Sequence, residues 1–430
     1  MTAPALTRAP RPVAAVGPPA VPPPFVVPAS FFVIALSWLV VGSVGLLAAA
    51  PALAQGNFLA PEVFATVHAF TLGVITTTIF GVFHQFLPMA LGVSARSVRA
   101  GLWALGALTA GTLVLVLGFW GDHSVLKGIG WILVLAAIGI EAWNLPTRKG
   151  RAPGSAHVRA HIAAGHAALG LALAFAGARI GENLGWWTVD RMGIIAAHFH
   201  LAALGFATLT AVGVGSRMLP MFLVSHGTPT WPVRFIAPTT LAGLLIFSVG
   251  AVTHIPLITI GGGLAMAVAA LLFVHLVRGF FARRLRRAID PPLTHVAVAI
   301  VGLAATVGVG LTLLLLPGTY PRLRVAYALL AILGWLVFLV LGILYKIFTH
   351  LSWIHVHGRR TSTAAVTVND LLRPNWTRAS LLLLVAGLLT LVLGIALASA
   401  RIATAGAVGW LLGAVLVPAQ YLRMFLPERS

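Results

Sequence analysis

The chain has 430 residues, of which 59% are hydrophobic and only 8% are charged. Soluble domains carry about 25% charged residues, so this composition excludes a soluble globular protein and predicts an integral membrane protein. There is no cysteine, which excludes thiolate-held iron–sulfur clusters, thiolate copper sites and haem attached through a Cys-x-x-Cys-His motif.

Residues 1–24 are rich in proline and alanine, and we expect a disordered cytoplasmic tail there. Residues 25–430 form a single polytopic membrane domain. A transmembrane helix needs about 20 apolar residues, and no stretch shows the alternation of a lipid-facing barrel strand. The predicted fold is an all-α integral membrane protein with about twelve transmembrane helices. They lie near residues 28–52, 62–92, 98–119, 124–146, 156–180, 189–223, 234–253, 255–279, 293–316, 323–349, 378–399 and 402–425.

The net charge of +20 comes from basic residues that gather in alternate connections between the predicted spans. Examples are the connections near residues 96–99, 148–159, 278–287 and 359–378. This positive-inside pattern predicts that both termini are cytoplasmic, in a multi-pass protein of a bacterial-type plasma (inner) membrane. We expect the basic loops to contact membrane lipid and not nucleic acid.

Two segments that lie far apart in the chain share one gapless pattern. His68, Leu72, Gly73, Thr76 and Thr78 recur as the same residue types when 132 is added to each number, and both segments end in Leu-Pro-Met. A weaker echo follows in the last third of the chain, where the Leu-Gly pair recurs as Leu333-Gly334. We interpret the domain as three pseudo-repeats of four helices, although repeats of this kind also build transporters. The repeat units cover about 28–146, 156–279 and 293–425.

The repeated histidines, His68 and His200, lie in the second and sixth spans. At about 1.5 Å per residue they lie roughly 9 and 15 Å beyond Glu62 and Asp190, at similar depths in the bilayer. Imidazole is a common ligand of haem iron and copper, so we expect the pair to be the axial ligands of one low-spin haem, of b type. The alternative is that each histidine only packs against a neighbouring helix. His84 lies about 24 Å along the axis from His68 and cannot share its haem.

His198 lies two residues before His200, and successive helical residues turn by about 100°. The two side chains therefore point to nearly opposite sides of the helix and cannot chelate one metal together. His198 either binds a second haem or hydrogen-bonds a neighbouring helix, and both interpretations stay open. In the weaker echo, Tyr327 occupies the position of His198, so we expect it to face the same cavity.

Other polar residues near the ends of the spans are further candidates. Arg217 could pair with a haem propionate, a lipid phosphate or the membrane surface. His350, His355 and His357 could form a metal site, although histidines at an interface need no metal. Glu141 lies inside the fourth span, where it could carry a proton, pair with a cation or be solvated at the boundary.

The motif His198-Phe-His200, its continuation Leu-Ala-Ala-Leu-Gly-Phe, and His68 together resemble subunit I of the haem–copper oxidases. NnrS-type haem–copper membrane proteins, associated with nitric oxide metabolism, are a comparably good relative. The resemblance implies that His68 and His200 hold a low-spin haem, and that His198 is proximal ligand to a second haem that reacts with O₂ or NO. The oxidases carry the His-x-His motif in the tenth span, whereas here it lies in the sixth. Copper in that family also needs a His-His pair, which this chain lacks, so the complete copper-ligand set is not found.

We therefore expect a haem-binding membrane redox protein that transfers electrons or handles O₂ or nitric oxide. If it is an enzyme, it is an oxidoreductase of the haem–copper oxidase or nitric oxide reductase-like class. A quinol or a cytochrome would donate electrons, and additional membrane subunits are candidate partners. The alternative is a repeat-built transporter that moves protons, copper or haem with the same histidines. A third interpretation is a scaffold that retains an oxidase fold.

Overall fold

The computed structural model describes residues 23–145, 155–285, 287–316, 318–357 and 367–425. Within these residues the elements are helices, with no strand among them. Twelve helical spans are long and apolar enough to cross a membrane, which confirms the expected all-α multi-pass membrane protein. The tail expected at residues 1–24 falls almost wholly outside the described residues, which begin at residue 23.

Nine of the described spans are single helices. They are α1 (Val26–Ala54), α4 (Val98–Trp120), α5 (Ser124–Asn144), α6 (Ala156–Asn183), α9 (Val233–Thr253), α10 (Pro256–Ala282), α11 (Pro291–Leu315), α14 (Pro374–Ala396) and α15 (Ala400–Phe425). A short 3₁₀ turn, η5 (Val368–Leu371), precedes α14.

The second, sixth and tenth spans are composite, because an eight-residue π-helical segment interrupts each α-helix. The second consists of α2 (Pro61–His68), η1 (Ala69–Thr76) and α3 (Thr77–Leu91). The sixth consists of α7 (Arg191–His200), η3 (Leu201–Thr208) and α8 (Leu209–Leu223). The tenth consists of α12 (Pro321–Leu329), η4 (Leu330–Val337) and α13 (Phe338–His357), and it extends beyond the predicted end at residue 349.

The π segments begin at Ala69, Leu201 and Leu330, which are equivalent positions in the three repeat units found in the sequence. In a π-helix the backbone bonds reach five residues back. The hydroxyls of Thr76 and Thr208 follow this wider turn, since each donates to the carbonyl five residues earlier at 2.9 Å. Segments of this kind are rare and frequently lie at functional sites.

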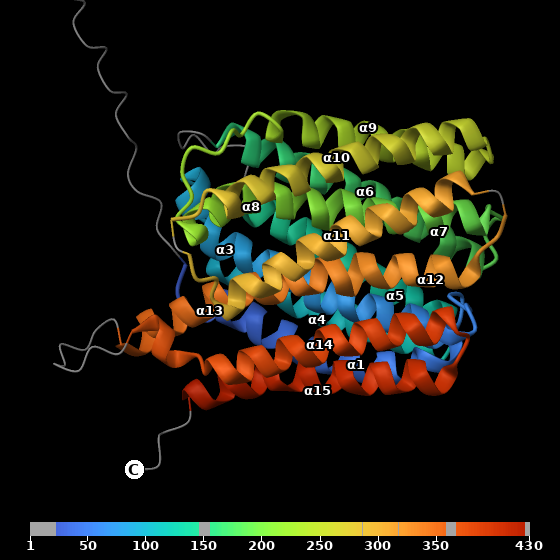
Figure 1. The fold of residues 1–430 in the computed structure, drawn as a ribbon. Helices are drawn as coiled ribbons and strands as arrows, with labels where there is room; N and C mark the ends of the chain where they lie inside the picture. Colours follow the sequence, from blue (N-terminus) through green and yellow to red (C-terminus); the bar gives the residue numbers. More distant parts are fainter. Residues whose placement is uncertain (1–22, 146–154, 286, 317, 358–366, 426–430) are drawn as a thin grey trace, which may run out of the picture.

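The composite spans occupy the centre of the bundle. Segments η1, η3 and η4 all contact one another, and the three composite spans are more buried than any of the nine single helices. Figure 1 shows α3, α8 and α13 at one end of the bundle and α7 and α12 at the other. The three spans therefore cross the membrane in the same direction, side by side.

Small residues let the first helix of each unit approach its π segment closely. Helix α1 packs on η1, α6 on η3 and α11 on η4. A Cβ on Gly73 would overlap Trp38 of α1, and a Cβ on Gly205 would lie 2.5 Å from Cβ of Ala168 on α6. Because helices in lipid associate through close packing, these glycines position the composite spans.

Candidate functional site

A cavity of about 600 Å³ lies between the composite spans and is lined by residues of all three repeat units. This volume is within the range of about 300–1,000 Å³ that is typical of small-molecule and cofactor pockets. Its wall is mostly apolar. The titratable side chains that line it are His68, His198, His200, His254, Arg324 and Tyr327.

The structure places His68 of α2 opposite His198 of α7. The two ring centroids lie 6.3 Å apart, and the ring planes are inclined by 26°. Nδ1 of His68 donates to the carbonyl of Phe64 at 2.8 Å, and Nδ1 of His198 donates to the carbonyl of Ala172 at 2.8 Å. These bonds fix both rings as the tautomer whose Nε2 is an unprotonated nitrogen with a free lone pair.

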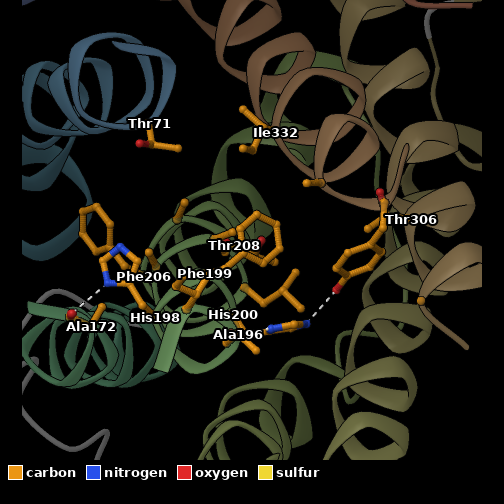
Figure 2. Close-up of a pocket in the computed structure, with 18 of the residues that line it drawn as sticks. Thr71, Ala172, Ala196, His198, Phe199, His200, Phe206, Thr208, Thr306 and Ile332 are labelled. Atoms are coloured by element: carbon orange, nitrogen blue, oxygen red, sulfur yellow. Dashed lines mark hydrogen bonds between the residues drawn. The ribbon is translucent and has the colours of Figure 1, made fainter. Parts of the chain in front are cut away.

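His200 points away from this pair, to the other side of α7 (Figure 2). Its Nδ1 donates to the carbonyl of Ala196 at 2.8 Å, and the phenol of Tyr327 lies 3.0 Å from its Nε2. Because Nδ1 carries the proton, Nε2 accepts from the Tyr327 hydroxyl. The structure thus brings His68 together with His198 and not with His200, and it confirms that Tyr327 faces the same cavity.

One geometric rule accounts for both contacts. In each case the histidine directly before a π segment meets a residue of the next repeat unit. That residue lies two positions before the one equivalent to the histidine, so His68 meets His198 and His200 meets Tyr327. The equivalent residues at the third boundary are Leu329 of the third unit and Thr66 of the first, and both line a small pocket of about 30 Å³.

Aromatic rings hold the two histidine contacts in place. Phe119 of α4 stacks on His68 with a centroid distance of 4.7 Å, and Phe247 of α9 lies 4.3 Å from the ring of His200. Buried Thr208 accepts a hydrogen bond of 2.9 Å from the indole of Trp335 in η4. These contacts restrict the orientation of the two histidine rings.

Ion pairs lie at the end of the bundle where α7 begins. Asp190 caps α7 by accepting a 2.7 Å hydrogen bond from the backbone of Gly193, and it lies 3.4 Å from Nε2 of His254. Buried Lys127 donates to Asp122 at 2.5 Å. This hydrogen bond and the ammonium charge hold the pKa of the Asp122 carboxyl below its usual range.

Arg217 is exposed and does not line the cavity. It lies 17 residues beyond His200 on one continuous helical span, about 25 Å at 1.5 Å per residue. The structure therefore does not place it where a haem held at the histidines would extend a propionate. Arg324, near the start of α12, is a basic residue that does line the cavity.

The three histidines at the end of α13 do not come together as a described metal site. His350 is exposed, and His355 stacks on Phe25 with a centroid distance of 4.2 Å. The side chain of His357 lies outside the described residues. In the described part of the chain no group of three or more histidine, aspartate and glutamate side chains could hold a metal ion.

Glu141 lies fully buried against His84, a contact that the sequence analysis did not find. Nε2 of His84 lies 3.2 Å from Oε1 and 3.3 Å from Oε2 of Glu141. The two residues belong to α3 and α5 and are 57 positions apart. Depth along each span could be predicted, but the direction of each side chain around its helix could not.

Comparison with known proteins adds no assignment. No family model matches the chain, and no curated protein matches it.

Proposed function

We propose that this chain is a haem-binding membrane redox protein of the haem–copper oxidase-like class, with His68 and His198 as the axial ligands. The observation that carries the proposal is the facing pair of imidazoles, each with Nδ1 bonded to a backbone carbonyl. Ligating histidines almost always donate their other ring N–H in this way, because the bond fixes the ring and raises the basicity of the ligand nitrogen.

The spacing of the two rings supports ligation of one ion. A metal–imidazole bond is about 2.0 Å long, so two imidazoles that share one ion lie several ångströms apart. The centroids of His68 and His198 are 6.3 Å apart. This distance is compatible with the two residues holding one haem iron between them.

Haem fits this donor set better than a bare metal ion. A bare ion such as zinc needs three or four protein ligands, and the described residues hold no group of three acidic or histidine side chains that could supply them. Haem iron takes only one or two ligands from the protein. The cavity of about 600 Å³, with its largely apolar wall, offers the volume and surroundings that a large flat cofactor needs.

With two imidazoles on the iron, the chemistry supplied by the haem would be electron transfer without gas binding. The protein's own part is to orient the rings through the carbonyls of Phe64 and Ala172 and to cover His68 with Phe119. His200 and Tyr327 form a second polar contact on the other side of α7. Electrons would come from a quinol or a cytochrome.

We further propose that the chain lies in a bacterial-type inner membrane with both termini in the cytoplasm. The support is the distribution of arginine and lysine between alternate connections, which biases such loops to the cytoplasmic side.

The test is an absorption spectrum of the purified protein, oxidised and dithionite-reduced, after expression with adequate haem. We expect a Soret band and low-spin bands that His68→Ala and His198→Ala each abolish. His200→Ala is the matched control, because its ring lies on the opposite side of the same helix and should leave the low-spin bands in place.

Two results would overturn this assignment. Absence of a Soret band would reject haem binding and favour a transporter that uses the same histidines. Loss of the low-spin bands in His200→Ala, with survival in His198→Ala, would return the ligand role to His200.

A further inference from the structure

A buried polar cluster lies in the first repeat unit, away from the cavity. It consists of His84 on α3, Glu141 on α5 and Asn144, the last residue of α5. All three side chains are at most 1% exposed. Gly101 of α4 leaves room for them, since a Cβ there would lie 3.0 Å from Nε2 of His84 and 3.5 Å from Nδ2 of Asn144.

The cluster contains buried polar atoms without a hydrogen-bond partner in the described part of the chain. They are Nδ1 of His84 and Nδ2 of Asn144, while Oε1 of Glu141 has only the 3.2 Å ion-pair contact with Nε2 of His84. Asn144 is fixed by its other atoms, because its Oδ1 accepts from the backbone of Ser97 at 2.9 Å and its carbonyl oxygen accepts from the backbone of Arg96 at 3.0 Å. Its amide N–H groups are thereby left facing the space that Gly101 opens beside His84.

The charge balance of the cluster depends on one proton. With neutral His84 and ionised Glu141 the pair carries one negative charge, and one additional proton makes it neutral. A carboxylate inside a membrane protein is costly unless it is paired or hydrogen-bonded, so an intramembrane carboxylate is a functional candidate. Here Nε2 of His84 is the one hydrogen-bond partner of the Glu141 carboxylate among the described residues.

Titratable residues lie on several of the packed elements. Helix α6, which packs on α5, carries His157, Arg159, His161, His166, Arg179 and Glu182. His166 stacks on Phe83, the neighbour of His84, with a centroid distance of 5.9 Å.

Helix α1 and segment η1 carry no titratable residue, and α3 carries only His84. Arg96 lies over the ring of Trp143 at 5.1 Å, and Arg99 is exposed. The titratable residues of α13, which packs on α3, are Tyr345, Lys346, His350, His355 and His357, and Lys346 is paired with Asp290. No second ion pair to His84 or Glu141 is found among the described residues.

We propose that His84, Glu141 and Asn144 form a proton-binding site that exchanges one proton with the medium at the end of the bundle where α3 and α5 end. The proton is taken from water and binds the Glu141 carboxylate, whose Oε1 has no partner other than Nε2 of His84 among the described residues. Glu141 lies three residues before the end of α5, about 4.5 Å along the axis, so the path to the medium is short. The site does not depend on haem or on the cavity.

Two residues of the other units provide matched controls. His295 of α11 is equally buried, and its Nε2 has no described partner, but it has no carboxylate within ion-pair distance in the described residues. Glu182 lies in α6 and is paired with Arg179. His295 is therefore a buried imidazole without a nearby carboxylate, and Glu182 is a carboxylate without a nearby histidine.

The experiment is infrared difference spectroscopy of the full chain in lipid nanodiscs, titrated over a range of pH. We expect a protonated-carboxyl band that grows as the pH falls and is lost in Glu141→Gln. His84→Phe removes the N–H that contacts the carboxylate, so it should change the midpoint of the titration. His295→Phe and Glu182→Gln should leave the band and its midpoint unchanged.

The proposal fails if the wild-type protein has no titrating carboxyl band, or if Glu141→Gln retains it. A permanently charged pair that never exchanges its proton would give the first result. If Glu141→Gln does not fold, ¹³C-labelled glutamate is introduced into the Glu182→Gln variant. The band must then shift with the label and respond to His84→Phe, and an unshifted band would reject Glu141 as the proton acceptor.

Discussion

The phenol of Tyr327 donates a hydrogen bond of 3.0 Å to Nε2 of His200, across the boundary between the second and third repeat units. Since Nδ1 of His200 is bound to the carbonyl of Ala196, both nitrogens of this ring have protein partners. His68 and His198 differ, because only their Nδ1 atoms have hydrogen bonds among the described contacts. The two contacts therefore differ in chemistry. Nε2 of His200 accepts a hydrogen bond from the phenol of Tyr327, whereas the Nε2 atoms of His68 and His198 each keep a lone pair without a described hydrogen bond.

Tyr327→Phe removes the hydroxyl and leaves the ring. We expect the free energy of unfolding to fall by about 0.5–1.5 kcal/mol, the typical net contribution of one hydrogen bond. The low-spin bands of haem-loaded protein should persist, because Tyr327 contacts His200 and not the proposed ligands. Thermal unfolding and absorption spectra of the variant measure the two effects. Loss of the low-spin bands would contradict the assignment of the ligands to His68 and His198.

Thr208→Val removes the acceptor of the Trp335 indole N–H. The indole is fully buried, so its N–H would have no partner, and such a group costs about 1–3 kcal/mol. Thr208→Ser keeps the hydroxyl and should retain most of the stability. The melting temperatures of the two variants in detergent test the difference, and equal values would show that this hydrogen bond contributes nothing.

Gly73→Ala places a Cβ against Trp38, where the second span crosses α1. Overpacking of this kind costs about 1–3 kcal/mol, so we expect a lower melting temperature. Gly139→Ala in α5 is the control, since a Cβ there meets nothing within 4 Å. Alanine is the better helix former by about 1 kcal/mol, so this variant should be unchanged or more stable.

Asp122→Asn removes the carboxylate that pairs with Lys127. The folded pKa of Asp122 is lowered, so the pair stabilises the fold above the unfolded pKa of about 3.9 and loses this effect as the pH falls through the lower folded value. The wild type should therefore melt at a higher temperature than the variant at neutral pH, and the gap should close in acid. Because Asp122 is exposed, salt should also reduce the gap. A gap that persists at low pH and high salt would contradict an electrostatic origin.

The twelve spans could be predicted because a transmembrane helix is defined by a length of apolar sequence, which is a property of the chain alone. The end of the tenth span was less well predicted. Residues such as His350 and Trp353 are polar or amphipathic, yet α13 continues through them to His357. Hydropathy reports where apolar residues stop, whereas a helix ends where its backbone bonds end.

The pairing of the histidines could not be predicted from the repeat. The repeat equates His68 with His200, and equivalent residues on rotated units need not face one another. In a head-to-tail ring each contact joins two different positions, which is why His68 meets His198 and His200 meets Tyr327. The placement of His198 and His200 on nearly opposite sides of their helix did predict that they serve two different contacts.

The His84–Glu141 contact depends on how α3 and α5 are rotated about their axes. The sequence placed Glu141 inside a span and suggested a cation or a proton as its partner. Nothing in the spacing of two residues that lie 57 positions apart specifies that their side chains meet.

Helix α7 forms the wall between the two histidine contacts, since His198 extends from one side and His200 from the other. The two contacts are therefore mechanically coupled, with opposite sign. A displacement of α7 that shortens the gap to His68 lengthens the hydrogen bond to Tyr327, and a displacement the other way tightens that bond at the expense of the imidazole pair. The two contacts thus share one support, a single helix about 10 Å across.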